Sequence, residues 1–288
     1  MAEKPQVAVI TGASSGIGLE TAKALAGEGW RIIAIGRNPA RCAAAEADLR
    51  TTARDQNVSM LQADLSLMAD TARLAERLTA LTDRIHILIN NAGGMVKSLA
   101  MTQEGLETCF AGNHLGPFLL TRQLLPLLRR AARDAPAGSV RIINTSSDGS
   151  EMIPGLNFTD LQSLKNFSPG AAYCSSKLAN DMFAKGLASR LAGDGILAFS
   201  DHPGTLASNF INHDPDTARQ HMATLAAISP VEGADTLTWL ATADAAELSN
   251  GGYYYLRKLR QPNPQAEDEV AVEKLWAESQ KLVLSAHV

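Results

Sequence analysis

Cysteine is scarce in this 288-residue sequence, and basic residues are not in excess. The three cysteines, Cys42, Cys109 and Cys174, lie far apart and form no Cys-x-x-Cys pair. Their number and spacing argue against a disulfide framework and a structural metal site, and they favour buried thiols in a reducing compartment. A net charge of −4 and a pI near 5.9 argue against nucleic acid or an anionic membrane as the main partner.

Long hydrophobic runs are missing as well. The first apolar run, Val7 to Ile10, follows a short polar stretch and is too brief for the core of a signal peptide. No stretch approaches the roughly 20 apolar residues that a membrane-spanning helix needs. We therefore expect a cytoplasmic protein without a membrane anchor.

A strand, a glycine-rich turn and a helix follow one another near the N-terminus. The β-branched run ends at Ile10, and apolar residues at helical spacing begin at Leu19. Gly12 permits a tight turn, Gly16 allows a phosphate to approach, and Gly18 allows the helix to pack on the strand. The turn predicts a pyrophosphate site, although glycine clusters also occur in plain strand-to-helix turns. The residues assigned to this site are Gly12, Ser14, Ser15, Gly16, Ile17 and Gly18.

Strand-like apolar runs alternate with helical patterns along the whole chain. The predicted strands cover residues 7–10, 31–35, 58–63, 85–89, 140–144, 196–200 and 252–256. The predicted helices cover residues 19–28, 39–54, 66–81 (capped by Ser66), 102–133 (broken near 112–117), 170–191, 231–242 and 266–284. The alternation predicts an α/β fold: one doubly wound (Rossmann) domain over residues 1–288, with a parallel sheet of about seven strands and helices on both faces.

Polar clusters follow the ends of the predicted strands. Arg37 comes after the second strand, Asp64 after the third, Asn91 after the fourth and Ser147 after the fifth. Because ligands of doubly wound sheets bind at the carboxyl ends of the strands, these clusters predict one shared site.

Tyr173 and Lys177 stand four residues apart in a predicted helix, so their side chains share one face. A nearby ammonium group favours the phenolate and lowers the tyrosine pKa, which suits the tyrosine to acid–base catalysis. Taken alone, the pair is common in surface helices, so its meaning depends on the other motifs.

Six motifs occur in a fixed order: Thr11-Gly-Ala-Ser-Ser-Gly-Ile-Gly18, Asn90-Asn-Ala-Gly93, Asn113, Ser147, Tyr173-x-x-x-Lys177 and Pro203-Gly204. In this order and at these intervals they resemble the short-chain dehydrogenase/reductase family, over nearly the whole chain. Residues 113–121, 173–180, 202–205 and 251–276 are further similar to its retinol dehydrogenase-like branch, which includes protochlorophyllide reductase relatives. Pro117 stands where that branch often has histidine, and the membrane anchor typical of animal retinol dehydrogenases is not found, so retinol is not the expected substrate.

The resemblance implies a catalytic set of four residues. Tyr173 would exchange a proton with the substrate oxygen, and Lys177 would lower the tyrosine pKa and hold the nicotinamide ribose. Ser147 would hydrogen-bond the substrate oxygen, and the choice of Ser147 over Ser146 rests on the family pattern. Asn113 would kink its helix and hold a water in a proton relay.

The cofactor preference depends on the end of the second strand. An NAD site commonly has an acidic residue there, whereas this chain has Arg37 and, one turn later, Arg41. An arginine can bind a ribose phosphate and stack on adenine, so we predict NADP(H) rather than NAD(H), with a solvated Arg37 as the alternative. The remaining cofactor contacts implied by the resemblance are Asp64, Leu65, Asn91, Ala92, Gly93, Pro203, Gly204, Leu206 and Ser208.

The expected function is hydride transfer between NADP(H) and a small apolar substrate, interconverting a carbonyl and an alcohol. The pocket is expected to form from three segments, of which residues 205–229 would be a lid. Its apolar lining would come from Met95, Val96, Met152, Ile153, Leu206, Phe210 and Ile211. Two alternatives stay open, a non-catalytic NADP(H)-binding sensor or scaffold and a C=C reductase of the same fold. A homodimer, a homotetramer and a monomer are all compatible with the sequence.

Overall fold

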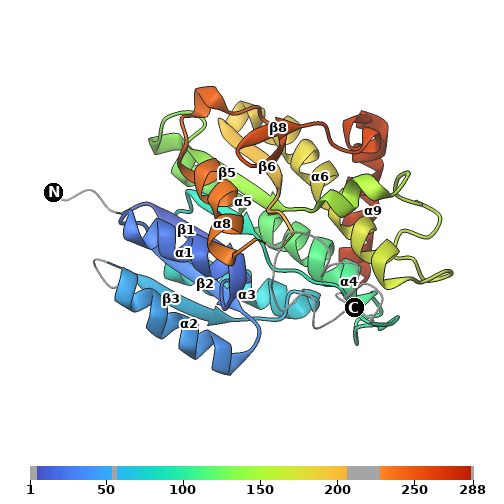
Figure 1. Cartoon of the computed structure of the whole chain (residues 1–288), viewed down its shortest axis with the longest axis horizontal. Coiled ribbons are helices and arrows are strands. Elements are labelled where there is room, and N and C mark those ends of the chain that lie inside the picture. Colours follow the sequence, from blue (N-terminus) through green and yellow to red (C-terminus); the bar gives the residue numbers. More distant parts are fainter. Residues whose placement is uncertain (1–4, 54–56, 206–227, 287–288) are drawn as a thin grey trace.

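Runs of buried β-branched residues form the centre of one sheet. The computed structural model describes residues 5–53, 57–205 and 228–286, and within these ranges eight strands pair in the order β3-β2-β1-β4-β5-β6-β7-β8 (Figure 1). The strands are β1 (Val7–Thr11), β2 (Arg31–Gly36), β3 (Val58–Gln62), β4 (Ile87–Asn90), β5 (Val140–Thr145), β6 (Ile196–His202), β7 (Tyr253–Tyr255) and β8 (Lys258–Arg260). All residues of β1 and β5 are buried, as expected for strands covered on both faces.

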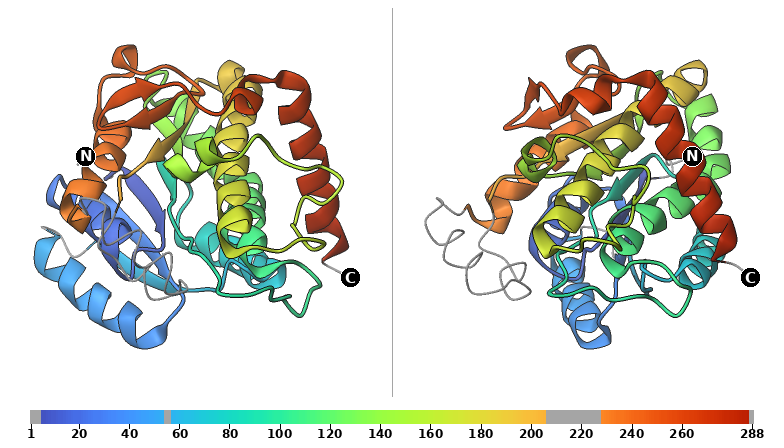
Figure 2. Two further views of the ribbon diagram at one scale, coloured as in Figure 1. Left: turned by 45° about the vertical axis from the view of Figure 1, so that its right-hand side comes forward. Right: turned by 90° about the vertical axis from the view of Figure 1, so that its right-hand side faces the viewer.

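Helices cover both faces of the sheet. They are α1 (Gly16–Gly27), α2 (Pro39–Thr52), α3 (Met68–Leu81), α4 (Thr108–Phe110), α5 (Gly116–Asp134), α6 (Pro169–Leu191), α8 (Pro230–Thr242) and α9 (Glu269–Ser285). Leu25 of α1, Leu49 of α2 and Leu237 of α8 belong to the core on one face. The core on the other face takes its side chains from α3, α5, α6 and α9, and α9 packs against α6 (Figure 2).

The chain reverses its direction of strand addition between β1 and β4. Strands β2 and β3 lie on one side of β1, and β4 to β7 lie on the other, all in parallel pairing. Such a switch point leaves a crevice at the carboxyl ends of the two central strands. The doubly wound parallel fold predicted from the sequence is confirmed.

The eighth strand is a correction to the predicted sheet. Residues 258–260 turn back antiparallel to β7 through Leu256 and Arg257, which both have a positive φ. The sequence did not indicate this strand because it is short, largely exposed and contains two charges.

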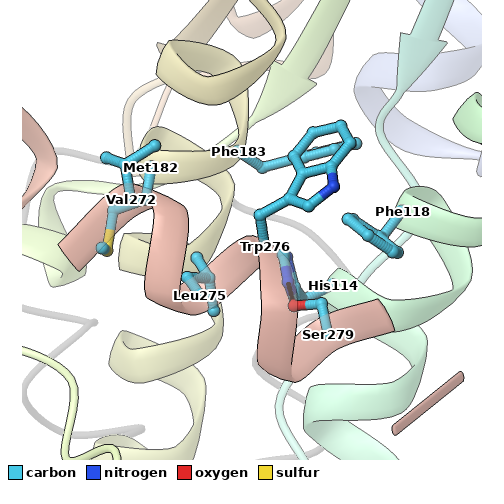
Figure 3. Close-up of a pocket in the computed structure, with 8 residues that line it drawn as sticks. All are labelled: His114, Phe118, Met182, Phe183, Val272, Leu275, Trp276 and Ser279. Carbon is cyan, nitrogen blue, oxygen red and sulfur yellow. Dashed lines mark hydrogen bonds between the residues drawn. The ribbon is translucent and has the colours of Figure 1, made fainter. Parts of the chain in front are cut away.

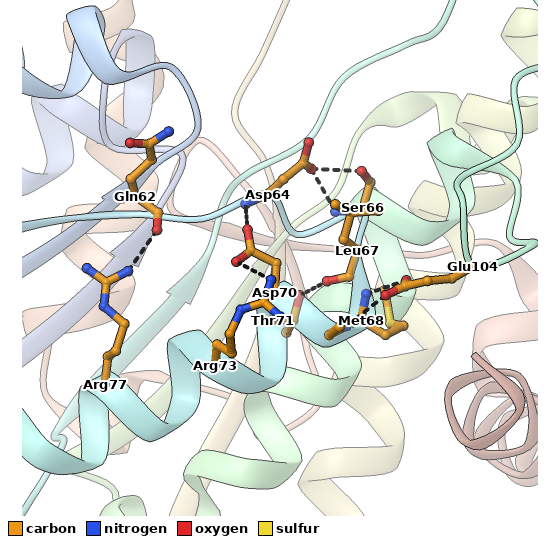
Figure 4. Close-up of polar contacts among 11 residues, drawn as sticks. Gln62, Asp64, Ser66, Leu67, Met68, Asp70, Thr71, Arg73, Arg77 and Glu104 are labelled. Atoms are coloured by element: carbon orange, nitrogen blue, oxygen red, sulfur yellow. Dashed lines mark hydrogen bonds and ion pairs between the residues drawn. The ribbon is translucent and has the colours of Figure 1, made fainter. Parts of the chain in front are cut away.

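Two predicted helix starts are wrong. The third helix begins at Met68 rather than at Ser66, whose hydroxyl donates to Asp64 instead of capping. The free amides of Met68 and Ala69 donate to the carboxylate of Glu104, a residue from another segment (Figure 4). The helix predicted from residue 102 starts at Thr108, because Glu107 caps it.

In the described part of the chain, every helix is too short or too polar to span a lipid bilayer.

Candidate active site

The glycine-rich turn has the shape of an anion cradle. Gly12 and Gly16 have φ values of +70° and +60°, and a Cβ on Gly12 would lie 2.8 Å from the Cα of Ala92. A Cβ on Gly18 would lie 2.6 Å from the carbonyl oxygen of Gly12, so the helix packs as close as the sequence predicted. A Cβ on Gly16 would meet nothing within 4 Å, which leaves open space beside the first turn of α1. That turn has no acidic residue, and Ser15 makes no capping bond across it, so the turn fits a pyrophosphate.

Arg37 lies exposed at the end of β2, beside the carboxylate at the end of β3. Its side chain is 64% exposed, and its guanidinium nitrogen lies 3.6 Å from Oδ2 of Asp64. The other oxygen of Asp64 accepts from the backbone and hydroxyl of Ser66 at 3.0 and 2.7 Å (Figure 4). Asp64 is therefore fixed, while most of the Arg37 side chain remains available to an anionic ligand. The second arginine, Arg41, is exposed in the first turn of α2.

Asn91 joins the ends of the two central strands. Its amide group donates to the carbonyl oxygen of Thr11 at 2.9 Å, and its backbone N–H donates to the Thr11 hydroxyl at 2.9 Å. Ala92 donates to the same hydroxyl at 3.0 Å. Asn91 and Ala92 were expected at the site from the sequence, whereas the role of Thr11 in holding them was not. Leu65, expected beside them, is buried.

Asn113 lies in a π-helical turn, Ala111–Leu115, between α4 and α5. Its side-chain oxygen accepts from the N–H of Gly94 at 2.9 Å, and its amide donates to the carbonyl of Gly94 and the hydroxyl of Ser176. A Cβ on Gly93 would lie 2.9 Å from that side-chain oxygen and 3.5 Å from Nζ of Lys177. The helix is not broken as predicted but continues through this π-helical turn, and Asn113 within it contacts Ser176, the neighbour of Lys177.

Tyr173 and Lys177 lie together on α6. Nζ of Lys177 lies 5.5 Å from the centre of the Tyr173 ring and donates to the carbonyl oxygen of Thr145 at 2.9 Å. Burial lowers the pKa of Lys177 to about 8. Burial also raises the pKa of Tyr173, and a hydrogen bond with Ser147 acts in the opposite direction. The lowered tyrosine pKa that the spacing predicted is thus not found in this structure, because loss of water around the phenol outweighs its neighbours.

The structure separates the two adjacent serines. The Ser147 hydroxyl hydrogen-bonds Tyr173 and accepts from the N–H of Gly149 at 3.1 Å. The Ser146 hydroxyl is buried and donates to the backbone carbonyl of Lys177 at 3.0 Å. Ser147 is therefore the serine that faces the tyrosine.

The expected substrate pocket is only partly within the described residues. Met95, Val96 and Ile153 are partly buried, whereas Met152 is 75% exposed. Pro203 and Gly204 follow β6 directly, and Gly204 has a φ of +95°. Most of the predicted lid, including Leu206, Ser208, Phe210 and Ile211, lies outside the described residues.

A small cavity lies behind the site, between the π-helical turn, α5, α6 and α9 (Figure 3). His114, the neighbour of Asn113, places its Nε2 2.8 Å from the hydroxyl of Ser279 there. Burial lowers the pKa of His114 to about 4, so the imidazole is neutral at physiological pH. The aromatic rings of Phe118, Phe183 and Trp276 surround it, and we interpret this cavity as a packing feature.

Two buried carboxyl groups near Lys177 were missed by the sequence analysis. Asp181 is one turn further along α6, and Asp201 is near the end of β6. Burial raises the pKa of Asp181 to about 6 and that of Asp201 to about 8. No sequence pattern indicated that they are buried, because each stands next to other polar residues and a charged residue by itself indicates a surface position.

Known proteins share the chain's sequence and fold. The short chain dehydrogenase family model matches residues 6–218. Human retinol dehydrogenase 12 is 37% identical over 279 residues, which cover 96% of this chain and 86% of the relative. An uncharacterised protein from Mycobacterium paratuberculosis is 30% identical, with a TM-score of 0.75 and coverage of 98% and 96% of the two chains. The RhlG/NADP complex from Pseudomonas aeruginosa is 28% identical, with a TM-score of 0.69 and coverage of 87% and 94%.

The family match covers the glycine-rich turn, Asn113, Ser147, Tyr173 and Lys177, which the fold brings to the carboxyl edge of one sheet. The chain belongs to the short-chain dehydrogenase/reductase family, in its retinol dehydrogenase-like branch, and is an NAD(P)-dependent oxidoreductase of alcohol and carbonyl groups.

Proposed function

We propose that this protein uses NADP(H) to interconvert a carbonyl and an alcohol on a small apolar substrate, with Tyr173 as the general acid and base. The observation that carries the proposal is the contact of Tyr173 with two polar partners. Ser147 hydrogen-bonds it, and Nζ of Lys177 lies 5.5 Å from its ring. All three residues lie at the edge of the sheet where the glycine-rich turn also ends.

Each residue has a distinct task in the proposed reaction. The cofactor supplies a hydride to the carbonyl carbon in reduction and accepts it in oxidation. In reduction the phenol of Tyr173 gives its proton to the carbonyl oxygen, and in oxidation the phenolate takes it back. The Ser147 hydroxyl holds that oxygen in place, and the Lys177 ammonium stabilises the phenolate. The lysine charge favours the phenolate and so acts against the effect of desolvation on the tyrosine pKa.

We propose NADP(H) as the preferred cofactor. An exposed guanidinium at the end of β2 suits a ribose phosphate, and Arg41 lies one turn away on α2. The open space at Gly16 supports a pyrophosphate site between the Arg37 guanidinium and the catalytic residues. Asp64, Leu65, Asn91, Ala92, Gly93, Pro203, Gly204, Leu206 and Ser208 complete the proposed cofactor contacts.

The proposed substrate is small and apolar. The partly buried side chains of Met95, Val96 and Ile153 support an apolar wall. The relatives in the comparison are retinol dehydrogenases by name, which supports an alcohol or aldehyde on an apolar skeleton as the substrate class. We also propose the cytoplasm as the location, since all three cysteines are free thiols in the structure.

NADPH oxidation by the purified protein tests this proposal. The panel consists of apolar ketones, aldehydes and enones, with NADH in parallel reactions. We expect turnover of a carbonyl with NADPH and slower turnover with NADH. Reduction of enones alone would make the protein a C=C reductase. Tight NADPH binding without turnover of any compound would favour a sensor or scaffold and contradict the catalytic proposal.

A further inference from the structure

Two carboxyl groups are buried beside Lys177 without a normal hydrogen bond. Asp181 is 3% exposed and Asp201 is 0% exposed. None of their four oxygens accepts a hydrogen bond of normal geometry from the described residues. A buried carboxyl group without such bonds is unfavourable when ionised, so its presence calls for a nearby positive charge.

Lys177 is the cation that both groups face. Its Nζ donates to the carbonyl oxygen of Thr145, and Thr145 pairs in register with Asp201 on β6. Neighbouring strands lie about 4.8 Å apart, so Asp201 lies one strand beyond the backbone acceptor of the lysine. Asp181 lies one helical turn after Lys177 on α6, so the two side chains share one face of that helix. The negative charge of each carboxylate opposes the effect of burial and favours the charged lysine.

The other groups around this cluster are neutral or belong to other pairs. Cys109 on α4 faces Lys177, but burial raises the pKa of its thiol to about 12. Tyr253 on β7 faces Asp181, and its hydroxyl donates to Glu151. His202, next to Asp201, stacks on the Tyr255 ring and faces the carboxylate of Asp148.

Serine hydroxyls at positions 146, 150 and 200 also lie near Asp181 and favour its ionised form. Asp181 lines a small cavity together with Ser200 and Tyr253, and Lys185 at its rim pairs with Glu267.

We propose that Asp181 and Asp201 are positioning residues that keep the Lys177 ammonium charged and thereby set the alkaline limit of catalysis. The inference rests on the proposed function, in which Lys177 must be charged to support Tyr173. Asp181 is ionised at neutral pH, and its negative charge favours the charged form of the lysine. Asp201 releases its proton near pH 8, in the range where the buried lysine would lose its own. A negative charge therefore forms beside Lys177 as the pH rises.

A direct test follows the Lys177 side chain without any turnover. The Nζ signal of protein labelled with ¹⁵N-lysine is titrated by NMR, and its assignment comes from Lys177→Arg. We expect the titration midpoint to fall by about one pH unit in Asp201→Asn, and also in Asp181→Asn, because a neighbouring negative charge is lost. Asp235→Asn, which removes an exposed carboxylate on α8, should keep the wild-type midpoint. An unchanged midpoint in both buried variants overturns the proposal.

The pH profile of kcat/KM then tests the catalytic consequence. We expect its alkaline limb to move to lower pH by the same amount in Asp201→Asn, with the Asp235→Asn profile as the reference. If the NMR midpoint of Lys177 shifts but the alkaline limb of the kcat/KM profile does not, the role of the two aspartates in catalysis is overturned. If the midpoint shifts and the wild-type protein reduces no carbonyl, the electrostatic role of the two aspartates stands and the proposed function fails. Using both isosteric variants keeps the test valid if one of them does not fold.

Discussion

At the scale of single residues, burial rather than sequence spacing determines the electrostatics of the site. Tyr173 and Lys177 are four residues apart, as a catalytic pair requires, yet desolvation shifts both groups toward their neutral forms. The hydroxyl of Ser147 and the carboxyl groups of Asp181 and Asp201 act against that shift. The chemistry of the pair therefore depends on partners that its motif does not contain.

Replacing the tyrosine hydroxyl should abolish turnover and spare cofactor binding. Tyr173→Phe removes the proton donor, and we expect kcat/KM to fall by about 10²- to 10⁴-fold. The dissociation constant for NADPH, measured by fluorescence titration, should change little. Tyr255→Phe is the matched control, because its ring can still stack on His202. Activity retained in Tyr173→Phe would remove the tyrosine from its proposed role.

Reversing one charge at the end of β2 should change the cofactor preference. In Arg37→Asp the carboxylate repels a ribose phosphate and can accept bonds from free ribose hydroxyls. We expect the ratio of kcat/KM for NADPH to that for NADH to fall at least about tenfold, which corresponds to about 1.4 kcal/mol. Arg130→Asp on α5 reverses an exposed charge elsewhere and should leave the ratio unchanged. An unchanged ratio in Arg37→Asp would mean that another group holds the phosphate.

At the scale of elements, close packing at the start of α1 is what shapes the cofactor edge. Gly18 lies against the carbonyl oxygen of Gly12 and the side chain of Asn91, and Asn91 in turn ties β4 to β1. A change at this position therefore reaches the central strands and not the helix alone.

Two glycines of the same helix should respond in opposite ways to alanine. Gly18→Ala forces a Cβ into the Gly12 carbonyl, so we expect a loss of about 1–3 kcal/mol in the free energy of unfolding. In Gly27→Ala the added Cβ meets nothing within 4 Å. We expect the free energy of unfolding to stay the same or to rise by about 0.4–1 kcal/mol. Urea unfolding of both variants decides the matter. Equal effects would mean that the contact at Gly18 relaxes without cost.

Sequence patterns predicted elements well where a local signal and the tertiary structure agree. Strands such as β1 and β5 were predicted because they consist of apolar, β-branched residues throughout. The start of α3 was wrong because its amides are capped by Glu104, which is distant in sequence. The burial of Asp181 and Asp201 was also not predictable, since a charged residue by itself indicates a surface position. Of the site, the motif residues could be named, but their protonation depends on burial that only the fold reveals.

At the scale of the whole molecule, the buried carboxyl groups make stability depend on pH. Asp181 and Asp201 have folded-state pKa values of about 6 and about 8, against 3.8 for an ordinary aspartate. The folded state therefore binds more protons than the unfolded state between about pH 4 and 8, so the free energy of unfolding falls as the pH rises through that window. His114 acts in the opposite sense below about pH 6.5, since its folded-state pKa is lowered.

The difference between variants isolates this effect. We expect the Tm of wild type, relative to that of the Asp181→Asn/Asp201→Asn double variant, to decline steadily from pH 5 to pH 8. The slope in free energy should not exceed about 1.4 kcal/mol per pH unit for each group. Asp235→Asn should follow wild type. A constant difference across the window would show that the two groups do not take up protons on folding.

The C-terminal hairpin also fixes the segment that follows Ser147. Tyr253 and Arg260 donate to the carboxylate of Glu151, and Asn263 donates to the carbonyl oxygens of Ser150 and Ile153. These supports come from residues near the end of the chain, and a domain generally folds as a unit. A chain that ended before β7 would carry every proposed catalytic residue and would still lack the bonds that hold the segment after the serine in place.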